Sequence, residues 1–183
     1  MTATALDPKT ALVVVDLQKG IVGLPTVHPT ADIVANSATL ADAFRAKGLP
    51  VVLVRVTGGA PGRTETPGPS GTPAADWAEI IPELGPREGD IVVTKQQWGA
   101  FYGTDLDLQL RRRGVTQVVV TGAATSIGVE STARSAHEHG YHVTVVTDAV
   151  TDLDADAHRN SVERIFPRLG ETDTTEAIAK LLG

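Results

Sequence analysis

The sequence contains no cysteine among its 183 residues, so no thiolate can act as a nucleophile. A cysteine-free chain is compatible with a reducing compartment, and we expect a cytoplasmic protein. The first ten residues, MTATALDPKT, lack the basic and apolar segments of a signal peptide, and no apolar run reaches the length needed to cross a bilayer. We therefore expect no membrane partner.

Basic residues are also few. The chain has 16 Lys and Arg against 22 Asp and Glu, a formal net charge of −6, and its basic residues are scattered. Binding to nucleic acid through counterion release needs a concentrated basic face, so we expect no nucleic-acid partner. The one basic run, Arg111 to Arg113, is interpreted as the solvated end of a helix, where cations interact favourably with the helix dipole.

The chain is 42% hydrophobic, which is enough at this length to form one sizeable core. Short apolar runs rich in β-branched residues alternate with segments that carry apolar residues at helical spacing. Continuous rather than alternating apolar runs are typical of parallel strands covered on both faces. The predicted strands are Ala11–Val15, Val51–Val56, Asp90–Thr94, Gln117–Thr121, Val143–Val146 and a short one near Gly170–Thr172, and the predicted helices are Ala31–Lys47, Asp105–Arg113, Val129–His139, Ala155–Phe166 and Thr174–Leu182.

This order predicts an α/β fold with three layers: a doubly wound, mainly parallel, six-stranded sheet of the Rossmann-like type. We expect a single domain over residues 1–183. The exception to the regular alternation is the segment 57–89, which is dense in Pro and Gly and too long for an ordinary strand-to-helix connection. Because Trp77, Ile80, Ile81 and Leu84 give it apolar anchors, we interpret it as a lid loop over a substrate rather than a disordered insert.

Ligands of open α/β sheets bind outside the carboxyl ends of the strands. Asp16 directly follows the first predicted strand and Lys95 follows the third, so each charge lies beside apolar residues where it needs a partner. A carboxylate or a lysine at such a position is, taken alone, more often a cap or a solvated charge. Together they predict a proton-transfer pair, with an ion pair kept only for folding as the alternative.

Three stretches, VVVDLQKG (13–20), TKQQWGAFYGTDLDLQLRRRGV (94–115) and VVVTGAATSIGVESTARSAHEHGY (118–141), followed by VTDAVTD (146–152), resemble the isochorismatase-like cysteine hydrolase superfamily. The resemblance extends over nearly the whole chain. It implies that Asp16 handles protons, that Lys95 is its cationic partner, and that Gly128 occupies the position of the nucleophilic cysteine. It also implies a cis peptide bond between Ala123 and Ala124. Homodimers or larger assemblies are expected on the same ground, with apolar surface at 98–102 and 106–110.

The resemblance further suggests which groups contact a substrate. Backbone N–H groups of Ala124 and Gly128 would face an oxyanion, and the side chains expected to line the pocket are those of Gln18, Trp98, Phe101 and Tyr102. Arg63 in the lid loop is a candidate partner for a substrate carboxylate, although an exposed arginine without that role is at least as common. The start of the helix near Gly128 also favours an anion, because helix N-terminal N–H groups carry partial positive charge.

Glycine at position 128 narrows the predicted chemistry. Amide-cleaving members of the superfamily use the cysteine, whereas some isochorismatases act without it. We therefore predict a cofactor-free hydrolase of a small, carboxylated molecule, with acid–base chemistry of the vinyl-ether type. The alternative is a catalytically inactive relic of a cysteine hydrolase with a small-molecule-binding or regulatory role. A general acid must be protonated near neutral pH, and the sequence leaves open whether burial or the Lys95 charge dominates the pKa of Asp16. We predict no metal or nucleotide site, because the five histidines lack ligand spacing and residues 122–128 match no nucleotide-binding motif.

Overall fold

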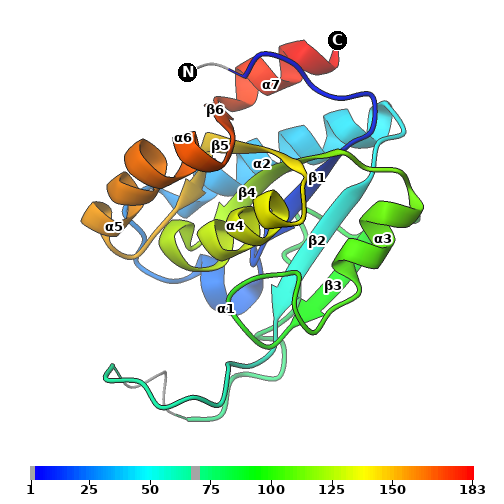
Figure 1. Ribbon diagram of the computed structural model, residues 1–183. Coiled ribbons are helices and arrows are strands. Elements are labelled where there is room, and N and C mark those ends of the chain that lie inside the picture. Colours follow the sequence, from blue (N-terminus) through cyan, green and yellow to red (C-terminus); the bar gives the residue numbers. More distant parts are fainter. Residues whose placement is uncertain (1–2, 67–70) are drawn as a thin grey trace.

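The computed structural model describes residues 3–66 and 71–183. Its centre is a sheet of six parallel strands in the order β3-β2-β1-β4-β5-β6 (Figure 1). This doubly wound, parallel sheet confirms the predicted fold class. The strands are β1 (Thr10–Val15), β2 (Val51–Val56), β3 (Ile91–Lys95), β4 (Gln117–Ala123), β5 (His142–Thr151) and β6 (Glu171–Asp173).

Helices cover both faces of the sheet. The helical segments are α1 (Lys19–Val22), α2 (Thr30–Ala46), α3 (Leu106–Arg112), the π-helical turn η1 (Thr125–Val129), α4 (Glu130–Glu138), α5 (Ala155–Asn160), the π-helical turn η2 (Ser161–Ile165), α6 (Phe166–Leu169) and α7 (Thr175–Leu182). In Figure 1, α2 lies behind the sheet and α4 in front of it. The side chains of β1 show why its sequence is apolar after Thr10: Val13 and Val15 join the core under α3, α4 and α6, while Leu12 and Val14 join the core under α2 and α7.

Three elements differ from the predicted ones. The short helix α1 was not predicted, because four residues carry no periodic signal. The helix predicted at Ala155–Phe166 is divided into α5, η2 and α6, and Pro167, which has no N–H to donate, lies in the first turn of α6. Strand β5 continues to Thr151, well beyond the predicted Val146.

The base of the 57–89 segment is attached to the start of α1. Ile81 and Leu84 are buried in the core under α2, and Ile80 forms an isolated antiparallel bridge with Gln18. The Lys19 N–H donates to the Glu79 carbonyl at 2.9 Å. Figure 1 shows the described tip of the segment extending away from the helices and sheet. The predicted apolar anchors are thus present, and the lid role itself stays a prediction.

The predicted apolar surface over 106–110 is wrong in part. Leu106 and Leu110 have no exposed surface and belong to the core, because the face of α3 that carries them packs on the sheet. The large apolar side chains exposed in this region are those of Trp98, Tyr102 and Leu108. No helix among residues 3–66 and 71–183 is long and apolar enough to cross a membrane.

Candidate active site

The candidate site lies where the chain connections of the sheet change direction, between β1 and β4. These strands are neighbours, with Val15 paired to Gly122, but their following connections lead to opposite ends of the sheet. Such a switch point is where doubly wound sheets bind ligands. Asp16 follows β1 and the η1 turn with Gly128 follows β4, so both lie at this point. Lys95 ends β3 on the same edge, two strands away from β1.

Lys95 and Asp16 form a buried ion pair. The Lys95 Nζ lies 2.7 Å from Asp16 Oδ2, and the two side chains are only 2% and 8% exposed. The remaining hydrogens of the ammonium group are directed to backbone, with the Trp98 carbonyl at 2.8 Å and the Gln97 carbonyl at 3.1 Å. The three acceptors hold the lysine charge in one place. The two charges predicted to need a partner are each other's partner.

Asp16 is the more unusual member of the pair. Its backbone adopts the left-handed conformation, with φ of 53°, which is uncommon for a residue other than glycine. Its Oδ1 is buried and has no hydrogen-bond partner among the described residues. Burial raises the pKa of Asp16 from 3.8 to about 6, and the nearby Lys95 charge lowers it by less. The question that the sequence left open is therefore answered in favour of burial.

Gly128 lies directly against this carboxyl group. A Cβ built on Gly128 would be 3.1 Å from Asp16 Oδ2 and 3.1 Å from Val15 Cγ1. These distances are shorter than ordinary van der Waals contacts, so the absence of a side chain leaves the carboxyl group only just enough room. Position 128 thus has the neighbour expected from the resemblance, but it carries a hydrogen atom where a thiol would be.

The turn before Gly128 is held by side chains that the sequence reasoning missed. The Ala123–Ala124 peptide bond is cis, as the resemblance implied. Asp152, at the end of β5 and 2% exposed, accepts a hydrogen bond from the Ser126 N–H at 2.6 Å. Asp152 belongs to the quoted VTDAVTD stretch, so a polar residue directly after an apolar strand was the available signal.

A pair of histidines lies beside the same turn. The Thr125 hydroxyl and His158 Nδ1 are 2.9 Å apart, and the rings of His158 and His28 meet edge to face with centroids 4.7 Å apart. Burial, and then the proximity of His28, lowers the pKa of His158. His158 is partly buried and His28 is exposed, and the spacing of the histidines along the chain gave no sign of their contact. They come together only because the segment before α2 and helix α5 both pack at the ends of β4 and β5.

The other predicted contact residues occupy different environments. Gln18 is fully buried, and its amide binds both the N–H and the carbonyl of Val56, at 2.8 and 3.0 Å, so it joins the ends of β1 and β2. Phe101 is buried in the core, with its ring stacked on His139. The side chains of Trp98 and Tyr102 are largely exposed, and Trp98 reaches the ion pair only through its carbonyl.

Arg63 lies on the exposed part of the 57–89 segment and makes no hydrogen bond or ion pair with a described residue. The Ala124 carbonyl accepts from the Val129 N–H at 3.1 Å, which shapes the η1 turn. The roles of Arg63, Ala124 and the pocket-lining side chains stay predictions.

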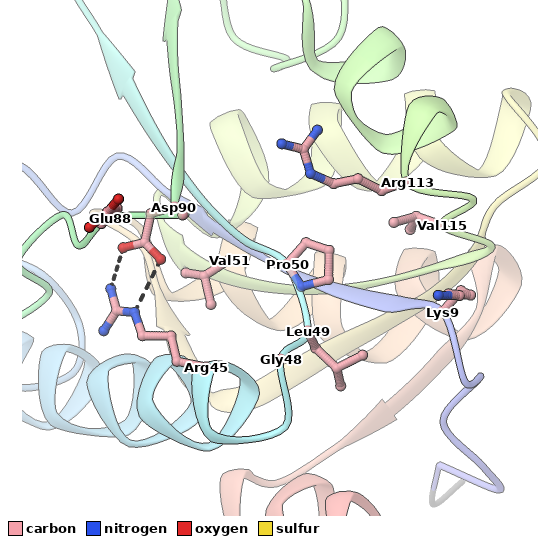
Figure 2. Close-up of a pocket in the computed structure, with 11 residues that line it drawn as sticks. Lys9, Arg45, Gly48, Leu49, Pro50, Val51, Glu88, Asp90, Arg113 and Val115 are labelled. Atoms are coloured by element: carbon pink, nitrogen blue, oxygen red, sulfur yellow. Dashed lines mark hydrogen bonds and ion pairs between the residues drawn. The ribbon is translucent and has the colours of Figure 1, made fainter.

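One cavity, of about 440 Å³, lies at the opposite edge of the sheet (Figure 2). Its lining includes Pro50 and Val51 at the start of β2, and Arg45 pairs with Asp90 along one side at 2.6 Å. Because it opens at the amino ends of the strands, it contains none of the groups described above. Among the described residues, no cluster of three or more His, Cys, Asp or Glu side chains could hold a metal ion.

The resemblance to isochorismatase-like hydrolases led us to expect an acid–base pair beside a strand-to-helix turn. The structure has a buried carboxyl–ammonium pair in this position, at the switch point of a doubly wound sheet. The model of the Isochorismatase domain matches residues 10–177, so the chain belongs to the isochorismatase family. It is a member without cysteine.

Curated relatives and a solved structure agree with this assignment. The chain is 48% identical over 175 residues to the uncharacterized isochorismatase family protein YwoC of Bacillus subtilis, covering 92% of this chain and 91% of YwoC. It is 32% identical to the ureidoacrylate amidohydrolase RutB of Methylobacterium radiotolerans, over 98% of this chain and 82% of RutB. An isochorismatase family protein from Burkholderia thailandensis superposes with a TM-score of 0.93 and 47% identity, covering 97% of each chain.

Proposed function

We propose that the protein is a cofactor-free hydrolase of a small carboxylated molecule, in which Asp16 transfers protons and no covalent intermediate forms. The observation that carries the proposal is the state of the Asp16 carboxyl group. One oxygen is held by Lys95 at 2.7 Å, and the other is buried without a partner among the described residues. A buried polar atom of this kind carries a free-energy cost, which a substrate would remove by binding to it.

The raised pKa supports a role as general acid. With a pKa of about 6, the carboxyl group is protonated in about half of the molecules at pH 6 and in roughly a tenth at pH 7. An ordinary aspartate would be protonated in only about a thousandth at pH 7. Burial therefore supplies the protonated form that vinyl-ether hydrolysis needs near neutral pH.

The proposed reaction begins with transfer of the Asp16 proton to the carbon of the enol ether double bond. Water then adds to the resulting oxocarbenium ion and returns a proton to the Asp16 carboxylate. The hemiketal collapses to a ketone and an alcohol, so the carboxyl group ends as it began. Lys95 stabilises the carboxylate while it has lost its proton, because its ammonium group is held in place by two backbone carbonyls.

The surroundings of Gly128 support this route over covalent amide cleavage. Relatives such as RutB are named amidohydrolases, and the chain shares their family. Without a thiol at position 128, however, the chain has no thiolate to attack an amide beside Asp16. An acidic substrate is proposed because the η1 turn and α4 begin beside Asp16, and N-terminal N–H groups of a helix favour anions.

The test is hydrolysis of carboxylated vinyl ethers, with carboxylated amides and ureides compared in parallel. We expect turnover of a vinyl ether and a loss of about 10²- to 10⁴-fold in kcat for Asp16→Asn. The matched control is Asp156→Asn, an exposed carboxylate on α5, which should keep wild-type activity. If carboxylated compounds raise the melting temperature but none is hydrolysed, the protein is a binding relic and the hydrolase proposal is refuted.

A further inference from the structure

A cavity of about 450 Å³ lies at the same edge of the sheet as Asp16, between α1 and the 57–89 segment. One of its lining residues, Thr57, follows the last residue of β2. The Thr57 N–H donates to the Lys95 carbonyl at 2.9 Å, and the preceding Val56 is bound by the Gln18 amide. The cavity therefore borders the end of β2 and, through the Thr57 hydrogen bond, the end of β3, the strand that ends in Lys95.

None of the described residues that line this cavity has a charged side chain. The groups that form it are the apolar side chains of Ile21, Leu24, Pro73 and Trp77, the hydroxyl-bearing Thr57 and Thr72, and glycines. The nearest cation in sequence, Lys19, is already paired with Asp76 at 3.0 Å and Glu79 at 2.6 Å. A carboxylate in this cavity would thus lack a free cationic partner, whereas an uncharged apolar group would lose nothing on leaving water.

Gly20 determines the shape of this cavity. A Cβ on Gly20 would lie 2.0 Å from Cδ1 and Nε1 of Trp77, so the indole can lie against the backbone of α1 only because position 20 has no side chain. The Trp77 carbonyl also accepts hydrogen bonds from the Gly20 N–H at 2.9 Å and from the Gln18 amide at 3.2 Å. The two hydrogen bonds hold the backbone of Trp77 at the start of α1, and the indole packs on Gly20, so Trp77 forms one wall of the cavity.

We infer that this cavity binds an uncharged, apolar portion of the substrate about the size of a benzene ring or a branched alkyl group, and that Trp77 and Gly20 determine specificity for it. The volume falls in the range of small-molecule sites, about 300–1,000 Å³. The inference rests on the proposed function and makes it narrower: the substrate has a carboxylate, which is bound near Asp16, and an apolar end, which is bound against Trp77.

Intrinsic fluorescence tests the cavity without relying on activity. The chain has two tryptophans, so Trp98→Phe leaves Trp77 as the only one. In this background we expect 3-phenylpropanoate to change the Trp77 emission in a saturable manner, and succinate, which has a charge at each end, to leave it unchanged at the same concentrations. Adding Gly20→Ala displaces the indole and should weaken the binding of 3-phenylpropanoate by about tenfold or more. Val27→Ala, at an exposed side chain outside the cavity, is the matched control and should bind as the background does.

The outcomes of these experiments distinguish the cavity inference from the hydrolase proposal. An equal response to succinate, or unchanged affinity in Gly20→Ala, overturns the inference. If the Trp77 response is as expected but no compound is hydrolysed, the cavity assignment stands and the hydrolase proposal fails. If vinyl ethers are hydrolysed with kcat/KM independent of the size of their apolar group, and Trp77→Ala leaves these values unchanged, the hydrolase proposal stands and the cavity inference fails.

Discussion

The Lys95 ammonium group contacts one of the two carboxyl oxygens of Asp16, Oδ2, at 2.7 Å. The other oxygen, Oδ1, is buried and has no hydrogen-bond partner among the residues that the structure describes. A carboxylate that is fully compensated by a cation and hydrogen bonds has a lowered pKa. Here the compensation is incomplete and burial has the larger effect, so the pKa is raised to about 6. This imbalance predicts an effect of the pair on the pH dependence of both stability and the proposed activity.

The first prediction concerns stability against pH. The pKa of Asp16 is higher in the folded state than in the unfolded state, so the folded protein binds more protons between about pH 4 and pH 6. The free energy of unfolding should therefore fall as the pH rises through this window, by about 3 kcal/mol in total from this group. Urea unfolding of wild type and Asp16→Asn at pH 4, 5, 6 and 7 measures it. As the pH rises, the free energy of unfolding of the wild type should fall relative to that of the variant. If the two proteins show the same dependence on pH, the raised pKa is contradicted.

The second prediction concerns the pH dependence of the proposed activity. If Asp16 is a general acid, activity should decrease as the pH rises above about 6, because the protonated form is lost. Lys95→Met removes the charge that lowers the Asp16 pKa, so the descending limb of the pH–rate profile should move to higher pH and kcat should fall. An unmoved limb would make Lys95 a structural residue. Lys180→Met, which removes an exposed cation of α7, is the control and should leave the profile in place.

The third prediction uses the absence of other cysteines. Gly128→Cys places a thiol near the end of the η1 turn, just before α4 and close to Asp16 and Lys95, where the helix dipole and the ammonium group favour the thiolate. We expect faster alkylation by iodoacetamide at pH 7 than for free cysteine, and weak amidase activity in addition. Because Val15 and Asp16 must move by a few tenths of an ångström, the cost in stability should be about 1 kcal/mol.

The control for that experiment is Gly128→Ala, which introduces the same Cβ without a thiol. If both variants fold and only the cysteine variant is modified, the geometry of the cysteine enzymes is retained at position 128. A folded but unreactive Gly128→Cys protein would show that this geometry has diverged.

The fourth prediction concerns the 57–89 segment. Its base should exchange amide hydrogens slowly, because Ile81 and Leu84 are buried and the Lys19 N–H binds the Glu79 carbonyl. We expect a carboxylated ligand with an apolar end to slow exchange at 57–66 and 71–77, which would support the lid role. Hydrogen exchange with and without 3-phenylpropanoate measures this, with α2 as the internal reference. Identical exchange in both states would make the segment a static part of the surface.

The fifth prediction is association into homodimers or larger assemblies. Trp98 and Tyr102 have exposed fractions of 63% and 65%, and Leu108 on the outer face of α3 is 49% exposed. Exposed aromatic side chains of this kind are enriched in protein–protein contacts. Light scattering should give at least twice the mass of one chain at micromolar concentration, and Tyr102→Asp should lower it. A monomeric wild type would reject the prediction.

The amino-acid sequence determined the architecture of this protein. Short apolar runs such as those of β1 and β2 are typical of strands covered on both faces, and regular alternation with helices leads to a parallel, doubly wound sheet. The positions of Asp16 and Lys95 at strand ends then placed them on one edge of the sheet. The glycine at 128 and the absence of cysteine could be read directly from the letters.

The environment of these residues was determined only by the tertiary structure. The pKa of Asp16 depends on how completely neighbouring segments exclude water and on how few donors reach its second oxygen, and neither is encoded in local sequence. The contact of His28 with His158, the hydrogen bond from Ser126 to Asp152 and the packing of Trp77 on Gly20 join segments that are distant along the chain. Local propensity and periodicity report on neighbours within a few residues, so contacts of this kind arise only when the elements have packed.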